Sequence, residues 1–177
     1  MVNRIILTGF MGCGKSSLGK AVARRRGILF LDTDALVEQR ALMSISEIFE
    51  KYGEAKFRQL ETETLQQLAE SDEEFVLSVG GGLVMNPVNR PILKEIGTVV
   101  YLHCSVDELY ERLKYDKSRP LLQGAADRRE RIEELLSQRS GVYEETADVT
   151  VSNTARAFSD VVDELVSLTD GSARDAV

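Results

Sequence analysis

The sequence of 177 residues contains no tryptophan, one histidine, two cysteines and three prolines. With one histidine, and with Cys13 and Cys104 far apart, the chain lacks the ligand spacing of a zinc site. Two cysteines cannot build the disulfide framework of a small secreted domain, so we expect both thiols to be free. No run approaches the roughly 20 consecutive apolar residues of a membrane-spanning helix, and the N-terminus lacks a signal-peptide pattern. These absences predict a cytoplasmic protein that does not enter a membrane.

The chain also lacks the positive charge that nucleic-acid-binding proteins carry, because its formal net charge is −7 at pH 7. Its basic residues gather in two islands: residues 1–31 hold six and no acid, and residues 111–139 hold eight against six acids. Two such islands in an acidic protein favour a small anion bound between them. The clusters at 24–26 and 128–131 fit solvated helix faces instead. We therefore expect a small anionic ligand and no nucleic acid.

Short apolar runs alternate with longer amphipathic segments, a pattern typical of parallel strands joined by helical crossovers. The predicted strands are residues 4–8, 28–31, 75–79, 98–103 and 148–151. Ser44 and Ser105 each precede a glutamate by three residues, which is the spacing of a capping box at a helix start. Gly53 predicts a break after the first of these starts. At this length we expect one three-layer α/β domain spanning residues 1–177.

The strongest chemical signal is the segment G-F-M-G-C-G-K-S at residues 9–16, which matches G-x-x-x-x-G-K-[ST] between a predicted strand and a predicted helix. Glycines let this loop turn tightly, so that backbone amides and the positive end of the helix face phosphate oxygens. The Lys15 ammonium suits the β- and γ-phosphates, and the Ser16 hydroxyl suits a magnesium ion. The expected nucleotide contacts are Gly12, Cys13, Gly14, Lys15, Ser16 and Ser17, with Cys13 serving only as a loop residue. The segment therefore predicts a magnesium-nucleotide site.

Two carboxylates follow the second predicted strand, at the sheet edge where ligands of open α/β folds collect. If the backbone stays extended, Asp32 and Asp34 point to the same side. Such a pair can hold magnesium through water and can orient or deprotonate an acceptor hydroxyl. Alternatively, Asp34 only caps a helix that begins at Ala35, and Asp32 lies in a turn. The sequence leaves both interpretations open.

Other features also allow two interpretations. The glycine triplet at residues 80–82 indicates either a ligand close to the backbone or a flexible turn. The loop at residues 116–127 is either a plain connector or a lid. Arg58, taken alone, fits a surface charge. His103 has no partner histidine and is expected to be structural.

Together these residues resemble the shikimate kinase family, from Arg4 to about Val166. The matching motifs are the phosphate loop at 9–16, D-T-D at 32–34, F-R at 57–58, the glycine triplet, R-P-L at 119–121 and R-x-x-x-Y-x-E at 139–145. The resemblance implies a P-loop kinase fold: a five-stranded parallel sheet in the order 2-3-1-4-5, with helices on both faces and a mobile lid at about 116–127. It also implies an ATP-dependent transferase that phosphorylates the 3-hydroxyl of shikimate, in the pathway to chorismate and aromatic amino acids.

The resemblance further implies roles for single residues. Asp34 would contact the acceptor hydroxyls as the candidate base, while Asp32 would hold Mg²⁺ through water. Arg58 and Arg139 would bind the shikimate carboxylate, which suits the paired donors of a guanidinium group. The remaining assignments are Arg119 on the transferring phosphoryl group, Arg112 near the adenine with the loop at 153–157 beside it, and an acceptor region at about 33–60. The implied catalytic residues are Lys15, Asp34 and Arg119; the metal ligands are Ser16 and Asp32; and the substrate contacts are Asp34, Arg58, Gly80, Gly81, Gly82 and Arg139.

Two alternatives remain beside a monomeric shikimate kinase that uses ATP. A gluconate-type sugar-acid kinase has similar length and fold and also binds a carboxylate, but the D-T-D, F-R and glycine-triplet set argues against it. A regulatory nucleotide-binding module would keep the phosphate loop and would need none of Asp34, Arg58 or Arg139.

Overall fold

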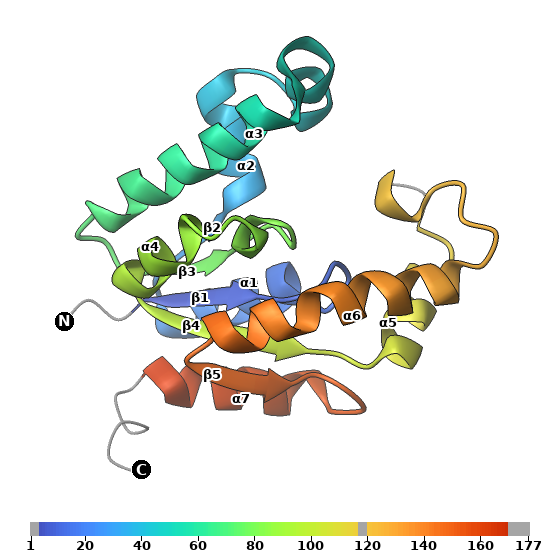
Figure 1. Ribbon diagram of the computed structural model, residues 1–177. Coiled ribbons are helices and arrows are strands. Elements are labelled where there is room, and N and C mark those ends of the chain that lie inside the picture. Colours follow the sequence, from blue (N-terminus) through green and yellow to red (C-terminus); the bar gives the residue numbers. More distant parts are fainter. Residues whose placement is uncertain (1–3, 117–119, 170–177) are drawn as a thin grey trace.

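Five short strands form the centre of the computed structural model, which describes residues 4–116 and 120–169 (Figure 1). They are β1 (Ile5–Thr8), β2 (Leu29–Asp32), β3 (Phe75–Ser78), β4 (Thr98–His103) and β5 (Val149–Ser152). Their order across the sheet is β2-β3-β1-β4-β5, and all neighbouring pairs are parallel. The predicted strands are confirmed to within one residue at each end, and the implied sheet order is confirmed.

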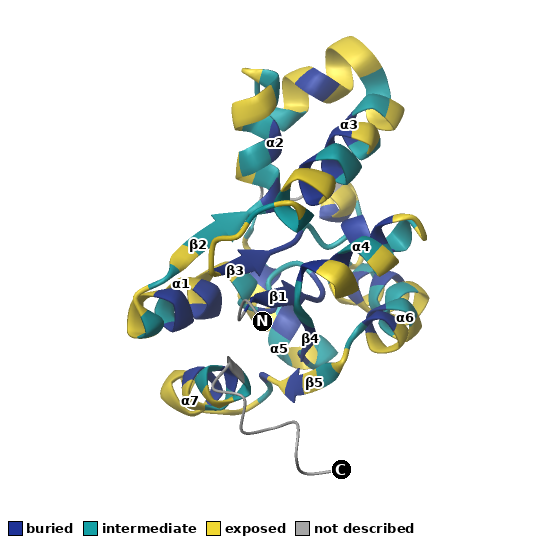
Figure 2. Ribbon diagram, turned by 90° about the vertical axis from the view of Figure 1, so that its left-hand side faces the viewer, coloured by how far each residue is buried: buried dark blue, intermediate teal, exposed yellow. Residues whose placement is uncertain are grey.

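Helices cover both faces of this sheet. They are α1 (Lys15–Arg26), α2 (Thr33–Ala41), α3 (Ile45–Ala69), α4 (Asn89–Ile96), α5 (Val106–Leu113), α6 (Arg128–Thr146) and α7 (Phe158–Thr169), with 3-10 turns η1 (Leu83–Met85) and η2 (Pro120–Leu122). In Figure 2, α1 and α7 lie on one side of the strands, and α4 and α6 lie on the other. Every residue of β1 and β3 is buried, as expected for parallel strands covered on both faces. The predicted three-layer arrangement is therefore confirmed.

The helix starts follow local capping chemistry. Ser44 and Glu47 form the predicted capping box, in which each side chain accepts a hydrogen bond from the other residue's backbone N–H. Gly53 has φ 78° and interrupts α3, so the predicted break is also confirmed. At Ser105 only half of the predicted box forms: its hydroxyl accepts from the Glu108 N–H, while its own N–H donates to Thr154 Oγ1. The sequence spacing predicted the helix start there, but not the partner of the Ser105 N–H.

The pair α2 and α3 projects from the sheet and has a small core of its own (Figure 1). This core consists of Val37, Ile48, Phe57 and Leu60 and is separate from the main cluster around the sheet.

Both cysteines are buried free thiols, as predicted. Within residues 4–116 and 120–169, no helix has the length and apolar composition needed to cross a membrane.

One tight contact gives a stability prediction for the fold. A Cβ at Gly97 would lie 2.5 Å from the Arg4 carbonyl oxygen and 2.7 Å from the Arg4 Cβ, where backbone cannot easily move. Gly97→Ala should therefore lower the free energy of unfolding by about 1–3 kcal/mol. Urea denaturation measures this quantity.

Gly141→Ala is the matched control. Gly141 lies within α6, and a Cβ there would meet nothing within 4 Å. Because alanine favours helix over glycine by about 1 kcal/mol, this variant should be as stable as the parent or more so. Equal destabilisation by both substitutions would contradict the packing argument.

Candidate active site

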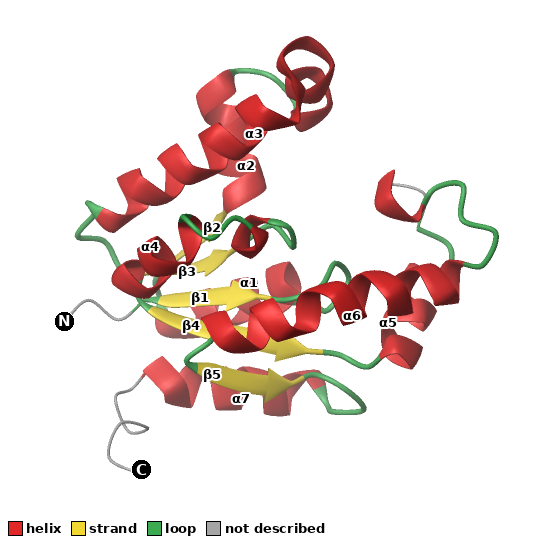
Figure 3. Cartoon of the chain, in the orientation of Figure 1, coloured by secondary structure: helices red, strands yellow, loops and turns green. Residues whose placement is uncertain are grey.

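The loop between β1 and α1 contains three positions whose backbone conformation suits glycine. Gly9, Gly12 and Gly14 have φ values of 140°, 77° and 101°, a region that other residues rarely adopt. Gly14 precedes the first turn of α1, which contains no acidic residue. The loop joins the carboxyl end of β1 to α1 (Figure 3). The positive end of α1 therefore opens toward this loop, as an anion site requires.

Lys15 lies folded across its own loop. Its ammonium donates to the carbonyl oxygens of Gly9 at 2.8 Å and Phe10 at 2.9 Å. Both acceptors are neutral, so the full positive charge is available to an anionic ligand. The role of Lys15 at phosphate stays a prediction.

Asp32 and Asp34 take different positions from those considered in the sequence. The helix α2 begins at Thr33, and Asp32 is its N-cap, accepting from the Asp34 N–H at 3.1 Å. The interpretation of Asp34 as the cap of a helix beginning at Ala35 is therefore wrong. The extended backbone assumed through Asp34 is also wrong, because Asp34 already belongs to the first helical turn.

Asp32 also faces the phosphate loop. Its second carboxylate oxygen accepts from the Ser16 hydroxyl at 3.4 Å. Within the described ranges, no cluster of three or more His, Cys, Asp or Glu side chains could hold a metal alone. A hydroxyl and a carboxylate are nevertheless the oxygen donors that Mg²⁺ takes when phosphates and water complete its shell. Ser16 and Asp32 therefore fit a magnesium ion that arrives with a nucleotide.

A cavity of about 280 Å³ joins these elements. It is lined by Met11, Gly12, Gly14, Lys15, Ser16, Ser17, Asp32, Asp34, Ser78, Val79, Gly80 and Gly81. The phosphate loop, both carboxylates and two residues of the glycine triplet thus share one space at the carboxyl edge of the sheet. This is where ligands bind in open α/β folds.

The glycine triplet lies close to two charged side chains. A Cβ at Gly80 would lie 2.9 Å from Asp34 Oδ1, and one at Gly82 would lie 3.2 Å from Arg58 Nη1. The Gly80 N–H donates to the hydroxyl of the buried Thr33 at 3.0 Å. A side chain on the triplet would therefore fill the space beside Asp34 and Arg58. This geometry favours close approach over a plain turn.

Arg58 lies in the middle of α3, and its side chain is 33% exposed. It contacts Glu61 at 2.8 Å and Glu54 at 3.0 Å. Burial raises the pKa of Glu61, opposed by the nearby Arg58 charge and reinforced by Asp34 and Glu54. Arg58 is thus not simply a solvated surface charge, because one of its partners is buried.

Arg139 approaches the triplet from α6. Burial raises the pKa of the Tyr143 hydroxyl, one turn further along the helix, to about 12, and the Arg139 charge opposes this rise. That hydroxyl donates to the Gly81 carbonyl oxygen at 2.6 Å. Arg58 thus lies beside the glycine triplet, whereas Arg139 lies one helical turn before the tyrosine that contacts it.

Arg112 lies on the other side of the phosphate loop. It donates to the Gly12 carbonyl at 3.2 Å and to the Asn153 carbonyl at 3.5 Å, and it pairs with Glu108. The Asn153 side chain donates to the Cys13 carbonyl at 2.7 Å. The first residue of the 153–157 loop thus contacts Arg112, and the position of both beside the adenine stays a prediction. The buried Cys13 forms part of the loop backbone, consistent with its predicted passive role.

Comparison with known proteins decides the family. The sequence profile described as "Shikimate kinase" matches residues 11–169. The chain belongs to the shikimate kinase family. A shikimate kinase from Geobacter sulfurreducens is 44% identical over 163 residues, which cover 92% of this chain and 88% of that protein. Membership makes the chain an ATP-dependent kinase, a phosphotransferase, as predicted.

Solved structures agree. Shikimate kinase from Acinetobacter baumannii, in complex with shikimate, has a TM-score of 0.84 at 36% identity and covers 95% of this chain and 93% of that chain. Shikimate kinase from Aquifex aeolicus has a TM-score of 0.80 at 38% identity, with 97% and 98% covered. A gluconokinase from Sinorhizobium meliloti is 19% identical with a TM-score of 0.52 and shows likeness of fold alone. The kinase family is therefore shikimate kinase and not the gluconate-type alternative.

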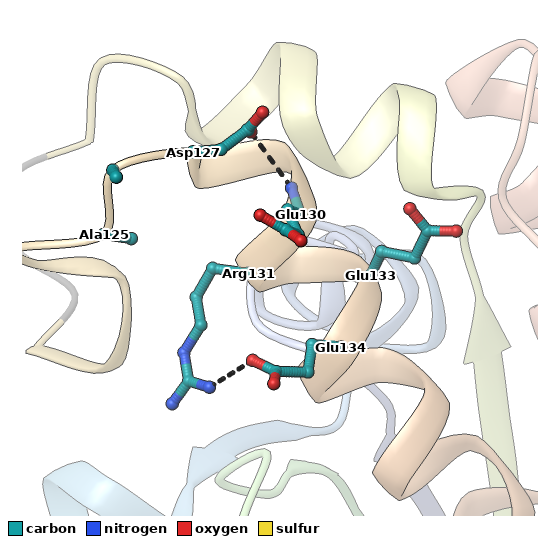
Figure 4. Close-up of a pocket in the computed structure, with 7 residues that line it drawn as sticks. Ala125, Asp127, Glu130, Arg131, Glu133 and Glu134 are labelled. Atoms are coloured by element: carbon teal, nitrogen blue, oxygen red, sulfur yellow. Dashed lines mark hydrogen bonds and ion pairs between the residues drawn. The ribbon is translucent and has the colours of Figure 1, made fainter.

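A second hollow, of about 600 Å³, lies at the start of α6 (Figure 4). It is lined by Ala125, Ala126, Asp127, Glu130, Arg131, Glu133 and Glu134. Arg131 is paired with Glu134 at 2.6 Å, and Asp127 caps α6. Although this hollow is larger, its four carboxyl groups would repel phosphate, and it contains no part of the phosphate loop. For these two reasons, the smaller cavity is the candidate active site.

Arg119, predicted for the lid, lies outside the described residues. The part of the loop that is described continues through η2, where Leu122 is buried in the main core and Arg131 donates to the Leu121 carbonyl.

Sequence reasoning assigned no role to Glu61, Thr33 or the Tyr143 hydroxyl. Glu61 has a sequence signal, because it lies three residues after Arg58 on one helix face. The other two depend on contacts distant in sequence.

The two functions of Asp32 can be separated by stability. Asparagine caps a helix about as well as aspartate, whereas alanine does not. Asp32→Ala should lower the free energy of unfolding by about 1 kcal/mol, and Asp32→Asn by only a few tenths. Urea denaturation of both variants without ligand tests this, and equal losses would show that the cap contributes little.

Proposed function

We propose that this chain transfers the γ-phosphoryl group of ATP to the 3-hydroxyl of shikimate, with Mg²⁺ bound beside the phosphates. The observation that carries the proposal is the cavity in which Asp34 and the glycine triplet face the phosphate loop. Arg58 lies beside Gly82, and Arg139 adds positive charge near Tyr143, which contacts Gly81. A cyclic acceptor that bears one carboxylate and several hydroxyls suits this arrangement.

On the nucleotide side, the loop amides and the start of α1 bind the phosphate oxygens, and Lys15 swings from its carbonyl partners onto the β- and γ-phosphates. Ser16 and Asp32 would hold Mg²⁺, which would neutralise phosphate charge when bound. Ser17 continues the loop surface, and Arg112 borders the adenine. Asp34 orients the acceptor hydroxyl and takes its proton as the new oxygen–phosphorus bond forms and the bond from the γ-phosphorus to the β–γ bridging oxygen breaks, which releases ADP.

On the acceptor side, two guanidinium groups fix a carboxylate in one orientation, because each donates paired hydrogen bonds. By resemblance, Arg119 enters with the lid and neutralises the transferring phosphoryl group while water is excluded. We also propose that residues 1–177 form one domain, which works as a monomer in the cytoplasm.

The two-arginine assignment predicts a specific loss of acceptor binding. Arg58→Ala and Arg139→Ala should each cost on the order of 2–4 kcal/mol of shikimate binding, as for truncated buried charge pairs. Nucleotide affinity should barely change. Arg40→Ala is the matched control, because Arg40 pairs with Glu63 on the same helix pair and does not line the cavity. The measurement is ADP release with ATP, Mg²⁺ and varied acceptor.

The acceptor itself offers an independent test. Shikimate methyl ester keeps the ring and the hydroxyls but loses the anion, so it should be a very poor substrate. Gluconate should also fail, because an open chain does not place its hydroxyl at Asp34 while its carboxylate meets both arginines. Equal rates with shikimate and its ester would overturn the two-arginine assignment, and a preference for gluconate would overturn the substrate.

Asp34→Asn tests the proposed base. The substitution preserves shape and removes the charge, so turnover should fall by about 10²- to 10⁴-fold while the melting temperature stays near that of the parent. Asp34 is not the cap of α2, and loss of its charge leaves the Asp32 cap intact. Activity within a few fold of the parent would return Asp34 to a structural role.

A further inference from the structure

Asn153 is a buried polar residue that joins the edge strand of the sheet to the phosphate loop. It follows β5 directly and is 7% exposed. Its side-chain amide donates to the Cys13 carbonyl at 2.7 Å, a contact that spans 140 residues of sequence. Because a carbonyl oxygen can only accept, the amide nitrogen and not the amide oxygen must face Cys13.

Neighbouring elements fix the backbone from which this side chain extends. The Asn153 N–H donates to the His103 carbonyl of β4 at 2.8 Å, and the Asn153 carbonyl accepts from Arg112 at 3.5 Å. A Cβ at Gly14 would lie 2.9 Å from Asn153 Nδ2. The amide therefore leaves a fixed backbone and packs directly against the loop.

The peptide unit between Cys13 and Gly14 is planar, so fixing its carbonyl also fixes its N–H. In a trans peptide unit these two groups point in opposite directions. This peptide bond is trans, and its carbonyl faces Asn153, so the Gly14 N–H faces away from Asn153. Gly14 lines the cavity that also contains Lys15 and Ser16. The amide of Asn153 thus sets the direction of a backbone donor at this cavity.

The Asn153 contact does not have to break when phosphate binds. Lys15 contacts the Gly9 and Phe10 carbonyls, and in the proposed function it leaves them for the β- and γ-phosphates. Arg112 also contacts a loop carbonyl, but its side chain is 31% exposed. A hydrogen bond shielded from water is stronger than one that competes with solvent. The buried amide of Asn153 is therefore suited to hold the loop both before and after the nucleotide binds.

We propose that Asn153 is a positioning residue that directs the Gly14 N–H toward the phosphates of the bound nucleotide. The inference rests on the nucleotide side of the proposed function and deepens it. A donor that is oriented before the ligand arrives improves binding, because less ordering is needed on association. The effect should therefore appear with any ligand that carries the phosphate chain, and not with the acceptor.

Asn153→Ala removes the amide, and inorganic tripolyphosphate supplies phosphates without an adenine. With Mg²⁺ present, the Kd of this variant for tripolyphosphate and for ADP should each rise about five- to tenfold, as for loss of one buried hydrogen bond. The Kd for shikimate should stay within about twofold of the parent, because the acceptor does not contact this loop segment. Isothermal titration calorimetry measures all three constants.

Two further variants separate positioning from folding. Asn89 is also buried, its side chain donates to the Leu83 carbonyl at 3.0 Å, and it is not among the residues that line the cavity. Asn89→Ala should lower the melting temperature and leave the Kd for tripolyphosphate and for ADP within about twofold. Asn153→Asp keeps the shape of the side chain and loses the donor, so both Kd values should rise at least as much as in Asn153→Ala.

The contrary results are distinct from a failure of the proposed function. Absence of ADP release with shikimate, in a parent that binds ADP, would overturn the proposed acceptor, and the Kd comparison would still decide the role of Asn153. A parent that binds neither ADP nor tripolyphosphate would overturn the nucleotide site and this inference together. A rise in Kd for ADP without one for tripolyphosphate would assign Asn153 to the adenine and overturn the inference. An equal rise for shikimate, an equal effect of Asn89→Ala, or failure of both Asn153 variants to fold would reduce Asn153 to a structural residue.

Discussion

The site depends on three consecutive peptide units that carry no side chain. After β3 the glycine triplet passes between Asp34 of α2, Arg58 of α3 and Tyr143 of α6. Any side chain on this segment would occupy the space that these groups share, and the backbone itself supplies an N–H to Thr33 and a carbonyl to Tyr143. The consecutive helices α2 and α3 and the distant helix α6 are therefore aligned on one short stretch of half-buried backbone.

The pairing of β1 with β3 also positions the phosphate loop relative to the glycine triplet. The two strands are parallel and in register from Ile5 opposite Val76, and the Val79 N–H continues the ladder by donating to the Leu7 carbonyl. The phosphate loop and the triplet then leave the same edge together. A Cβ at Gly81 would be 3.4 Å from the Gly9 carbonyl oxygen. Because the two loops extend adjacent strands, the sheet sets the distance between phosphate donor and acceptor.

Patterns local in sequence predicted much of this architecture. Short apolar strands, the phosphate loop and the Ser44 capping box depend on neighbours in the chain, so they could be predicted from the sequence. Sheet order came from resemblance, because strand composition does not state which strands are adjacent. The helix boundary after β2 was missed by two residues, which transferred the cap from Asp34 to Asp32. Such boundaries depend on single hydrogen bonds that periodicity does not resolve. The Tyr143–Gly81 contact spans 62 residues of sequence and had no local signal.

The helix α3 takes part in two cores. Ile48 packs with Val37 in the small core of the helix pair, whereas Leu65, further along α3, is buried in the main core around the sheet. One buried polar link lies near the triplet: Asn89 donates to the Leu83 carbonyl and accepts from Thr62 of α3 at 2.7 Å. Thr62 lies one helical turn from Arg58, so this link fixes the part of α3 that carries the guanidinium. The acceptor side of the site is therefore anchored to the sheet through the segment that follows the glycine triplet.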